Sequence, residues 1–238
     1  MIAAALELFR RYPFEEISLT AIAESAGGSR ALVYHYFGGK QGLYDEVMHR
    51  AGTLMCELFE EPMEGPASER LSRVMGRYLE FTARHRAGFL ALLRGGAATQ
   101  TTSAAAVIGE VRRRGEDEIF RHLGLVGPRE ALRRAVQGWI AAVEAASLNW
   151  LSDLTVPLEE VQLQLTQDLI AAVVVAAARD AELATELGRF FAVEREDGPV
   201  AQLVRQLAGL AGVPEVAREV CRLAAPVPPP APRAMRVS

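Results

Sequence analysis

Apolar residues recur at helical spacing along most of this chain, and few stretches alternate as a strand would. The pattern predicts helices at 2–11, 19–26, 30–37, 40–59, 68–85, 87–94, 101–123, 128–153 and 157–187, with one or two more between 199 and 224. Tyr12-Pro13 should end the first of them, since a residue before proline avoids the helical region. We therefore expect an all-α protein.

The stretch from 18 to 44 predicts two short helices joined by a glycine turn, with a third following at once. Ser18 and Ser29 are good N-caps for the short helices, and Gly27 and Gly28 can end the first by taking positive φ. This is the layout of a helix-turn-helix, whose second helix enters the major groove of DNA. From the pattern alone, an ordinary helical hairpin with surface tyrosines is the alternative.

A specific set of residues gives this stretch a family resemblance. They are Ala4 to Phe9 (AALELF), Ser18-Leu19, Ile22-Ala23, Ala26-Gly27, Ser29-Arg30, Tyr34-His35-Tyr36-Phe37, Gly38, Lys40, Leu43 and Tyr44. With them, residues 2–48 resemble the DNA-binding domain of TetR-family transcriptional regulators. The resemblance implies a ligand-responsive repressor that binds a palindromic operator as a homodimer. We expect a DNA-binding domain at 1–48 and an effector-binding and dimerisation domain at 49–224.

Roles in DNA binding follow for individual residues. By resemblance, Tyr34, Tyr36 and Lys40 hold phosphates, and Ser18 can offer a phosphate its hydroxyl and the first N–H groups of its helix. Base reading falls to Arg30, Ala31 and Leu32 at the start of the second short helix, with Thr20 from the first. His35 is open between a base and a backbone contact. Two positions depart from the family pattern, Gly28 in place of an apolar residue and Leu32 in place of a small or hydroxylated one.

The C-terminal part predicts both a dimer and a ligand chamber. The helices at 128–153 and 157–187 are apolar around most of their circumference, so each should be buried on two sides, one of them by a second copy. The candidate chamber residues are Tyr78, Phe81, Phe89, Leu92, Phe120, Trp139, Val143, Glu144 and Asn149. They favour a small, mostly apolar effector with Glu144 or Asn149 as a polar anchor. For each residue alone, plain core packing is the alternative.

Charge changes this picture little. The net charge of −4 argues against strong non-specific DNA affinity, but hydroxyls, N–H groups and helix N-termini also bind phosphates. Arg112-Arg113-Arg114 stand at i,i+4 spacing from Glu116-Asp117-Glu118, which predicts a self-paired, solvated face. Histidines 85 and 122 are open between a pocket and a surface or capping role. Two distant cysteines give no disulfide framework and indicate reduced thiols.

Other classes of protein find little support. No catalytic motif, metal spacing or cofactor fingerprint is present, so an α-helical enzyme is remote. The longest uncharged apolar run, Leu169 to Ala178, is half of the ~20 residues that a membrane span needs. We expect a soluble, cytoplasmic protein without cofactor or metal, and an extended or disordered Pro-rich tail at 225–238. The alternative to a repressor is a small-molecule-binding protein with impaired or lost DNA binding.

Overall fold

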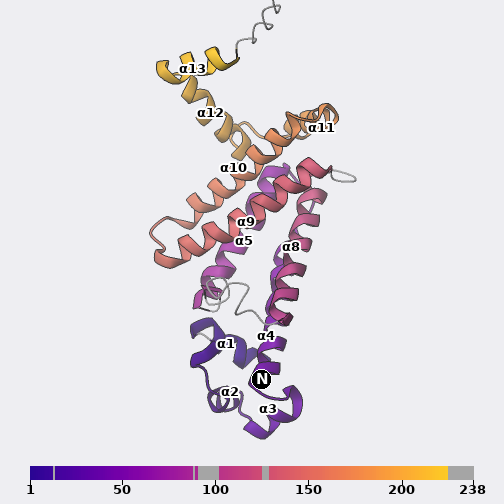
Figure 1. Ribbon diagram of the computed structural model, residues 1–238, viewed down its shortest axis with the longest axis vertical. Coiled ribbons are helices and arrows are strands. Elements are labelled where there is room, and N and C mark those ends of the chain that lie inside the picture. Colours follow the sequence, from indigo (N-terminus) through magenta and orange to yellow (C-terminus); the bar gives the residue numbers. More distant parts are fainter. Residues whose placement is uncertain (13, 88, 91–101, 125–128, 225–238) are drawn as a thin grey trace, which may run out of the picture.

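Helices make up the architecture throughout the described part of the chain. The computed structural model describes residues 1–12, 14–87, 89–90, 102–124 and 129–224. In order, these residues form α1 (Ile2–Arg11), a 3-10 turn (Phe14–Glu16), α2 (Leu19–Ser25), α3 (Arg30–Phe37), α4 (Lys40–Leu58), α5 (Ala67–Arg84), α8 (Thr102–Leu123), α9 (Glu130–Asp153), α10 (Leu158–Ala177), α11 (Ala181–Phe191), α12 (Pro199–Ala211) and α13 (Pro214–Ala224) (Figure 1). No strand occurs among them, so the all-α prediction is confirmed.

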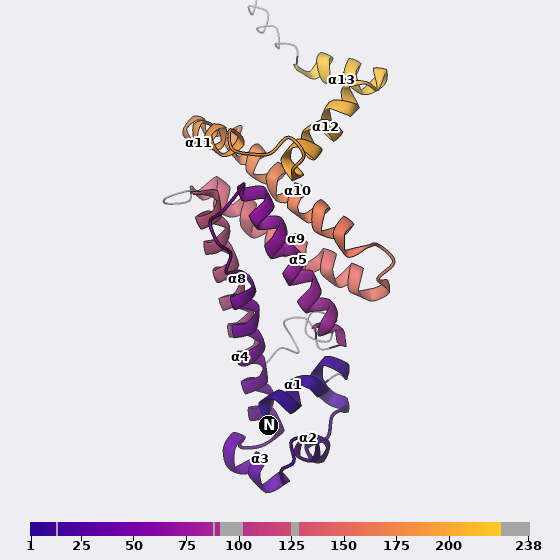
Figure 2. The same cartoon turned by 180° about the vertical axis from the view of Figure 1, so that it is seen from behind.

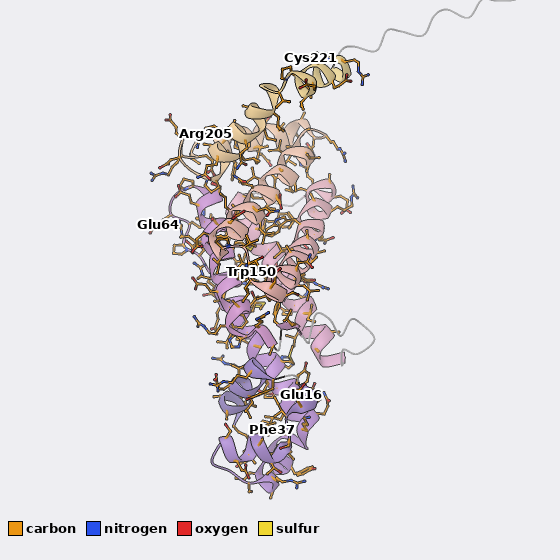
Figure 3. All side chains as sticks on the ribbon, turned by 90° about the vertical axis from the view of Figure 1, so that its left-hand side faces the viewer. Glu16, Phe37, Glu64, Trp150, Arg205 and Cys221 are labelled. Carbon is orange, nitrogen blue, oxygen red and sulfur yellow. The ribbon has the colours of Figure 1, made fainter. Side chains whose placement is uncertain are left out.

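The molecule is elongated, with a small head at one end. α1, α2 and α3 form the head, and α4 runs out of it alongside α8 into a bundle with α5, α9 and α10 (Figures 1 and 2). α12 and α13 project from the opposite end. Phe37 therefore marks the head, Trp150 the bundle and Cys221 the projecting end (Figure 3).

The head folds around a compact apolar core to which each of its helices contributes. That core holds Ala5, Ile17, Ile22, Ala23, Val33, Leu43 and Val47. The two predicted caps are confirmed, because Ser18 Oγ accepts from the Ala21 N–H at 3.0 Å and Ser29 Oγ from the Leu32 N–H at 3.3 Å. Gly27 takes the expected positive φ of 64°, but Gly28 does not, so one left-handed residue is enough to end α2.

α4 belongs to the head and to the bundle at once. Its first turns place Leu43 and Val47 in the head core, and further on Met55 and the following Phe59 pack against the core of the bundle. Residue 48, the expected domain boundary, thus lies inside a continuous helix. α4 crosses α8 so closely that a Cβ built on Gly52 would stand 2.4 Å from Val107 Cγ1.

The prediction of one long helix from 157 to 187 is wrong, because the structure has two helices there. α10 ends at Ala177, and α11 begins at Ala181. Asp180 breaks the helix because its carboxylate accepts from the N–H groups of Glu182 and Leu183, both at 3.1 Å, and pairs with Arg129. The side-chain cap and this ion pair replace the backbone bonds that a continuous helix would make.

α9 and α10 are buried on one side only within a single chain. α9 leaves Gly138, Ala141, Ala142 and Ala145 exposed, and α10 leaves Val174 and Val175 exposed. Among the described residues, α10 is the one helix long and apolar enough to cross a membrane, judged by its length and composition. Half of that stretch is buried in the protein. A core helix of a folded bundle passes the same test.

Candidate DNA-binding face and ligand cavity

α3 turns most of its side chains to solvent at the tip of the head. Val33 is fully buried and anchors the helix, whereas Tyr34 and Tyr36 are 54% and 69% exposed. Arg30, Ala31, Leu32 and His35 are exposed as well. The predicted reading residues therefore share one accessible face.

The predicted contacts outside α3 flank that face. Ser18 and Thr20 are exposed at the start of α2, where the Ser18 hydroxyl already accepts from the Ala21 N–H. Lys40, at the start of α4, is half-buried, and its ammonium lies 4.2 Å from the centre of the Phe14 ring. Phe14 in turn packs on Tyr44, with ring centres 4.5 Å apart. The lysine thus lies against an aromatic pair.

The glycine that departs from the family pattern sits in a filled turn. A Cβ on Gly28 would stand 3.3 Å from Met1 Cε and 3.6 Å from Leu32 Cδ1. Met1 also packs against the head core. The methionine and leucine side chains therefore cover the place where a larger residue at position 28 would pack.

An apolar cavity of about 220 Å³ runs from the head into the bundle. Its lining from the head and α4 includes Leu6, Phe14, Tyr44, Met48 and Met55; from α8 it includes Val107, Val111 and Arg112. Of the predicted ligand residues, it brings together Tyr78, Phe81, Phe89, Trp139, Val143 and Glu144. Because one space touches both domains, an occupant would contact the helix that carries the head.

Two predicted ligand residues do not line the cavity, and a third is not among the described residues. Phe120 packs in the core beside Leu132 and Leu169, and Asn149 is exposed on α9, so it needs no buried partner. Leu92 lies outside the described residues, as does most of the short helix expected at 87–94. Plain core packing, the alternative left open for each candidate, is thus what the structure shows for Phe120.

Arg112 lines the cavity, although the charge spacing predicted that it would pair on the surface of its own helix. Arg114 pairs with Glu118 at 3.0 Å as predicted, and Arg113 pairs with Glu110, but Glu116 and Glu118 are buried, so the prediction of a solvated face is wrong. Arg112 instead reaches across to α9, where Nε and Nη2 bind the two oxygens of Glu144, each at 2.7 Å. Spacing within one helix predicted Glu116 as the partner of Arg112. Its actual partner, Glu144, comes close only because α8 packs on α9.

A dense polar cluster closes one end of the cavity. Arg70 is buried, donating from Nε to His122 Nδ1 at 3.0 Å and from Nη2 to the His122 carbonyl at 2.8 Å. Burial, with Arg121 and Arg70 beside it, lowers the pKa of His122 from 6.5 to about 4, so the ring is neutral near pH 7. His122 and His85 both line the cavity, and His85 packs on Phe81 with ring centres 4.4 Å apart. Their position in the cavity wall fits a pocket role for both histidines better than a surface or capping role.

Tyr78 lies at the centre of the lining and is buried. Burial raises the pKa of its hydroxyl well above the ordinary value, so it stays protonated and able to donate. Next to it, Trp139 donates from its indole to the Leu165 carbonyl at 2.9 Å, which fixes that ring. The described residues include no group of three His, Cys, Asp or Glu side chains arranged to hold a metal.

A three-helix head with an exposed reading helix, joined by a shared helix to a bundle that encloses an apolar cavity, defines a helix-turn-helix transcriptional regulator. The model for bacterial regulatory proteins of the tetR family matches residues 1–47, and that for the tetracyclin repressor-like C-terminal domain matches residues 67–172. A tetR-family transcriptional regulator from Streptomyces coelicolor is 41% identical, with a TM-score of 0.84, over 89% of this chain and 95% of that one. The chain belongs to the TetR family.

More distant structures share the fold. A TetR transcriptional regulator from Rhodococcus is 18% identical with a TM-score of 0.54, over 73% of this chain and 93% of that one. The fatty acid degradation regulator FadR from Bacillus halodurans is 15% identical with a TM-score of 0.57, over 71% of this chain and 91% of that one. No match to this chain is found among curated proteins. Family members are generally DNA-binding transcription factors rather than enzymes, and a repressor role and a homodimer are typical of them.

Proposed function

We propose that this protein is a cytoplasmic repressor that binds a palindromic operator as a homodimer and is released by a small, mostly apolar effector. Residues 1–48 read the operator, and residues 49–224 bind the effector and the second copy. The observation that carries the proposal is the cavity wall, which includes Tyr44 and Met48 of the helix that leaves the head.

The cavity gives the effector a direct way to act on the head. α4 rests on α8 at the close Gly52–Val107 crossing, and the cavity lies along this crossing. An effector that fits better when α4 is tilted shifts the population toward that state, in which two heads no longer match adjacent major grooves. A tenfold loss of operator affinity requires about 1.4 kcal/mol of such coupling.

DNA binding is tested by footprinting on the DNA upstream of the protein's own coding sequence, followed by affinity measurements with variants. Arg30→Ala should relax the base preference, since a bidentate arginine–guanine pair contributes about 1–3 kcal/mol of discrimination. Tyr34→Phe and Lys40→Ala should weaken binding to all sequences alike. Glu24→Ala, on the exposed side of α2, is the control. Absence of any footprint would instead favour the alternative, a small-molecule-binding protein without DNA function.

The homodimer is proposed to form through α9 and α10. Small side chains on α9, at Gly138, Ala141, Ala142 and Ala145, allow a helix of the second copy to approach closely. Val174 and Val175 of α10 extend the patch. A monomer would leave this surface in water, although soluble monomers seldom expose large apolar patches.

Light scattering at micromolar concentration tests the interface. Ala145→Arg should convert the dimer to a monomer, because the new charge would be buried at the helix contact without a partner. Ala105→Arg, on the exposed side of α8, should leave the dimer intact. A wild-type monomer, or a dimer that tolerates Ala145→Arg, contradicts the proposed interface.

A further inference from the structure

We infer that the cavity takes an anionic amphiphile, a carboxylate with an apolar chain, whose head is held by Arg112. The inference rests on the proposal that this cavity is the effector site and specifies the chemical class of the effector. It departs from the sequence-based expectation of Glu144 or Asn149 as the polar anchor.

The first argument is the set of donors that Arg112 has left. A guanidinium carries five N–H groups, and Glu144 takes one from Nε and one from Nη2. Both N–H groups of Nη1 and the second of Nη2 make no hydrogen bond among the described residues. Two of these three, one on Nη1 and one on Nη2, form the end-on fork that can bind a carboxylate in bidentate fashion. Glu144 thereby orients the fork without blocking it.

The second argument is that the carboxylates in the wall are already neutralised. Glu144 uses both oxygens on Arg112, and Glu118 pairs with Arg114 at 3.0 Å and with Arg121 at 2.7 Å. A cationic ligand would have to displace a guanidinium from either of them. An anion finds unused donors, so the wall discriminates by charge.

The position of Arg112 sets the orientation of the ligand. Its side chain is 52% exposed although it lines the cavity, so it stands at the mouth. The remaining wall is almost entirely apolar, with Met48, Met55, Val107 and Val111 between the mouth and the head. A charged head at the mouth stays partly hydrated while an alkyl chain enters toward α4.

The test compares three probes of equal chain length by isothermal titration at pH 7, namely decanoate, decanol and decyltrimethylammonium. Decanoate should bind once per chain and at least tenfold more tightly than the other two. Arg112→Gln/Glu144→Gln, which removes the pair without leaving a lone charge, should abolish that preference. Arg113→Gln, one residue along the same helix and paired on the surface with Glu110, should keep it.

The outcomes separate this inference from the proposed function. Equal binding of decanol and decanoate, a preference for the ammonium, or a preference that survives the double substitution overturns the anionic class. In those cases the effector role of the cavity still stands if the bound probe lowers operator affinity. Conversely, Arg112-dependent decanoate binding that leaves operator affinity unchanged supports the anion site and removes the effector role. If no probe binds, both are overturned.

Discussion

The close crossing of α4 and α8 makes Gly52→Ala a sharp probe of how the head is attached. A methyl group there would meet Val107 Cγ1 at 2.4 Å, well inside van der Waals contact. Val107 is buried and β-branched in a helix, so it has essentially one rotamer and cannot swing aside. Overpacking costs about 1–3 kcal/mol. Replacing a helical glycine by alanine returns about 1 kcal/mol. We expect a net loss of up to about 2 kcal/mol.

The measurement is urea unfolding at a fixed chain concentration, with two further variants. Gly109→Ala on α8, where an added Cβ meets nothing within 4 Å, should stabilise by about 0.5–1 kcal/mol. Val107→Ala removes the side chain that the new methyl group would meet. In the double variant, Gly52→Ala should therefore cost less than it does alone, by a coupling energy of about 0.5–3 kcal/mol. If Gly52→Ala stabilises the protein as Gly109→Ala does, α4 and α8 are not in contact at this crossing, and the proposed route from cavity to head fails.

Three further predictions concern a cap, a titration and the thiols. Ser18→Ala should lower the free energy of unfolding by about 1 kcal/mol through the lost cap, whereas Ser25→Ala at the end of α2 should leave it within about 0.5 kcal/mol, as measured by denaturant titration. Because the native pKa of His122, about 4, lies below 6.5, its contribution to stability is complete above pH 6.5 and is lost as the pH falls toward 4. His122→Gln should therefore flatten the decline in unfolding free energy between pH 7 and 5, and an unchanged slope would refute the neutral buried ring. Cys221 is exposed, while Cys56 is half-buried and burial raises the pKa of its thiol, so an aromatic disulfide reagent should react first with Cys221. Cys221→Ser should remove the fast phase, and a fast phase that persists would place the reactive thiol at Cys56.

Local signals in the sequence were enough to predict most helix ends. Ser18, Ser29 and the Gly27 turn act over a few residues, and α2 and α3 begin and end where those residues require. The missed break between α10 and α11 is different, because Asp180 is held by Arg129 from 51 residues away. Residues that distant meet only after the bundle has packed.

The candidate sites divide in the same way. The outward face of α3 follows from one helical period around Val33, so its residues could be predicted together. Cavity residues could not, because an apolar ring such as that of Phe120 or Tyr78 suits a packed core and a cavity wall equally well, and only Tyr78 borders the void. The role of Arg112 was missed for the complementary reason, since its partner Glu144 lies 32 residues away on another helix. Pairing rules within one helix cannot identify such a partner.

Since α4 supplies side chains to two cores, heat should unfold the head and the bundle in one transition. Loss of the bundle would remove the packing that holds the far half of α4, and a short helix on its own is marginal in water. The same feature limits how heads can be exchanged between regulators. A chimaera cut at residue 48 would join two halves of one helix, each chosen for a different neighbour. A working exchange would keep Gly52, Met55 and Phe59 with the bundle they pack against, and would take from the donor only the residues that face its own α1 and α3.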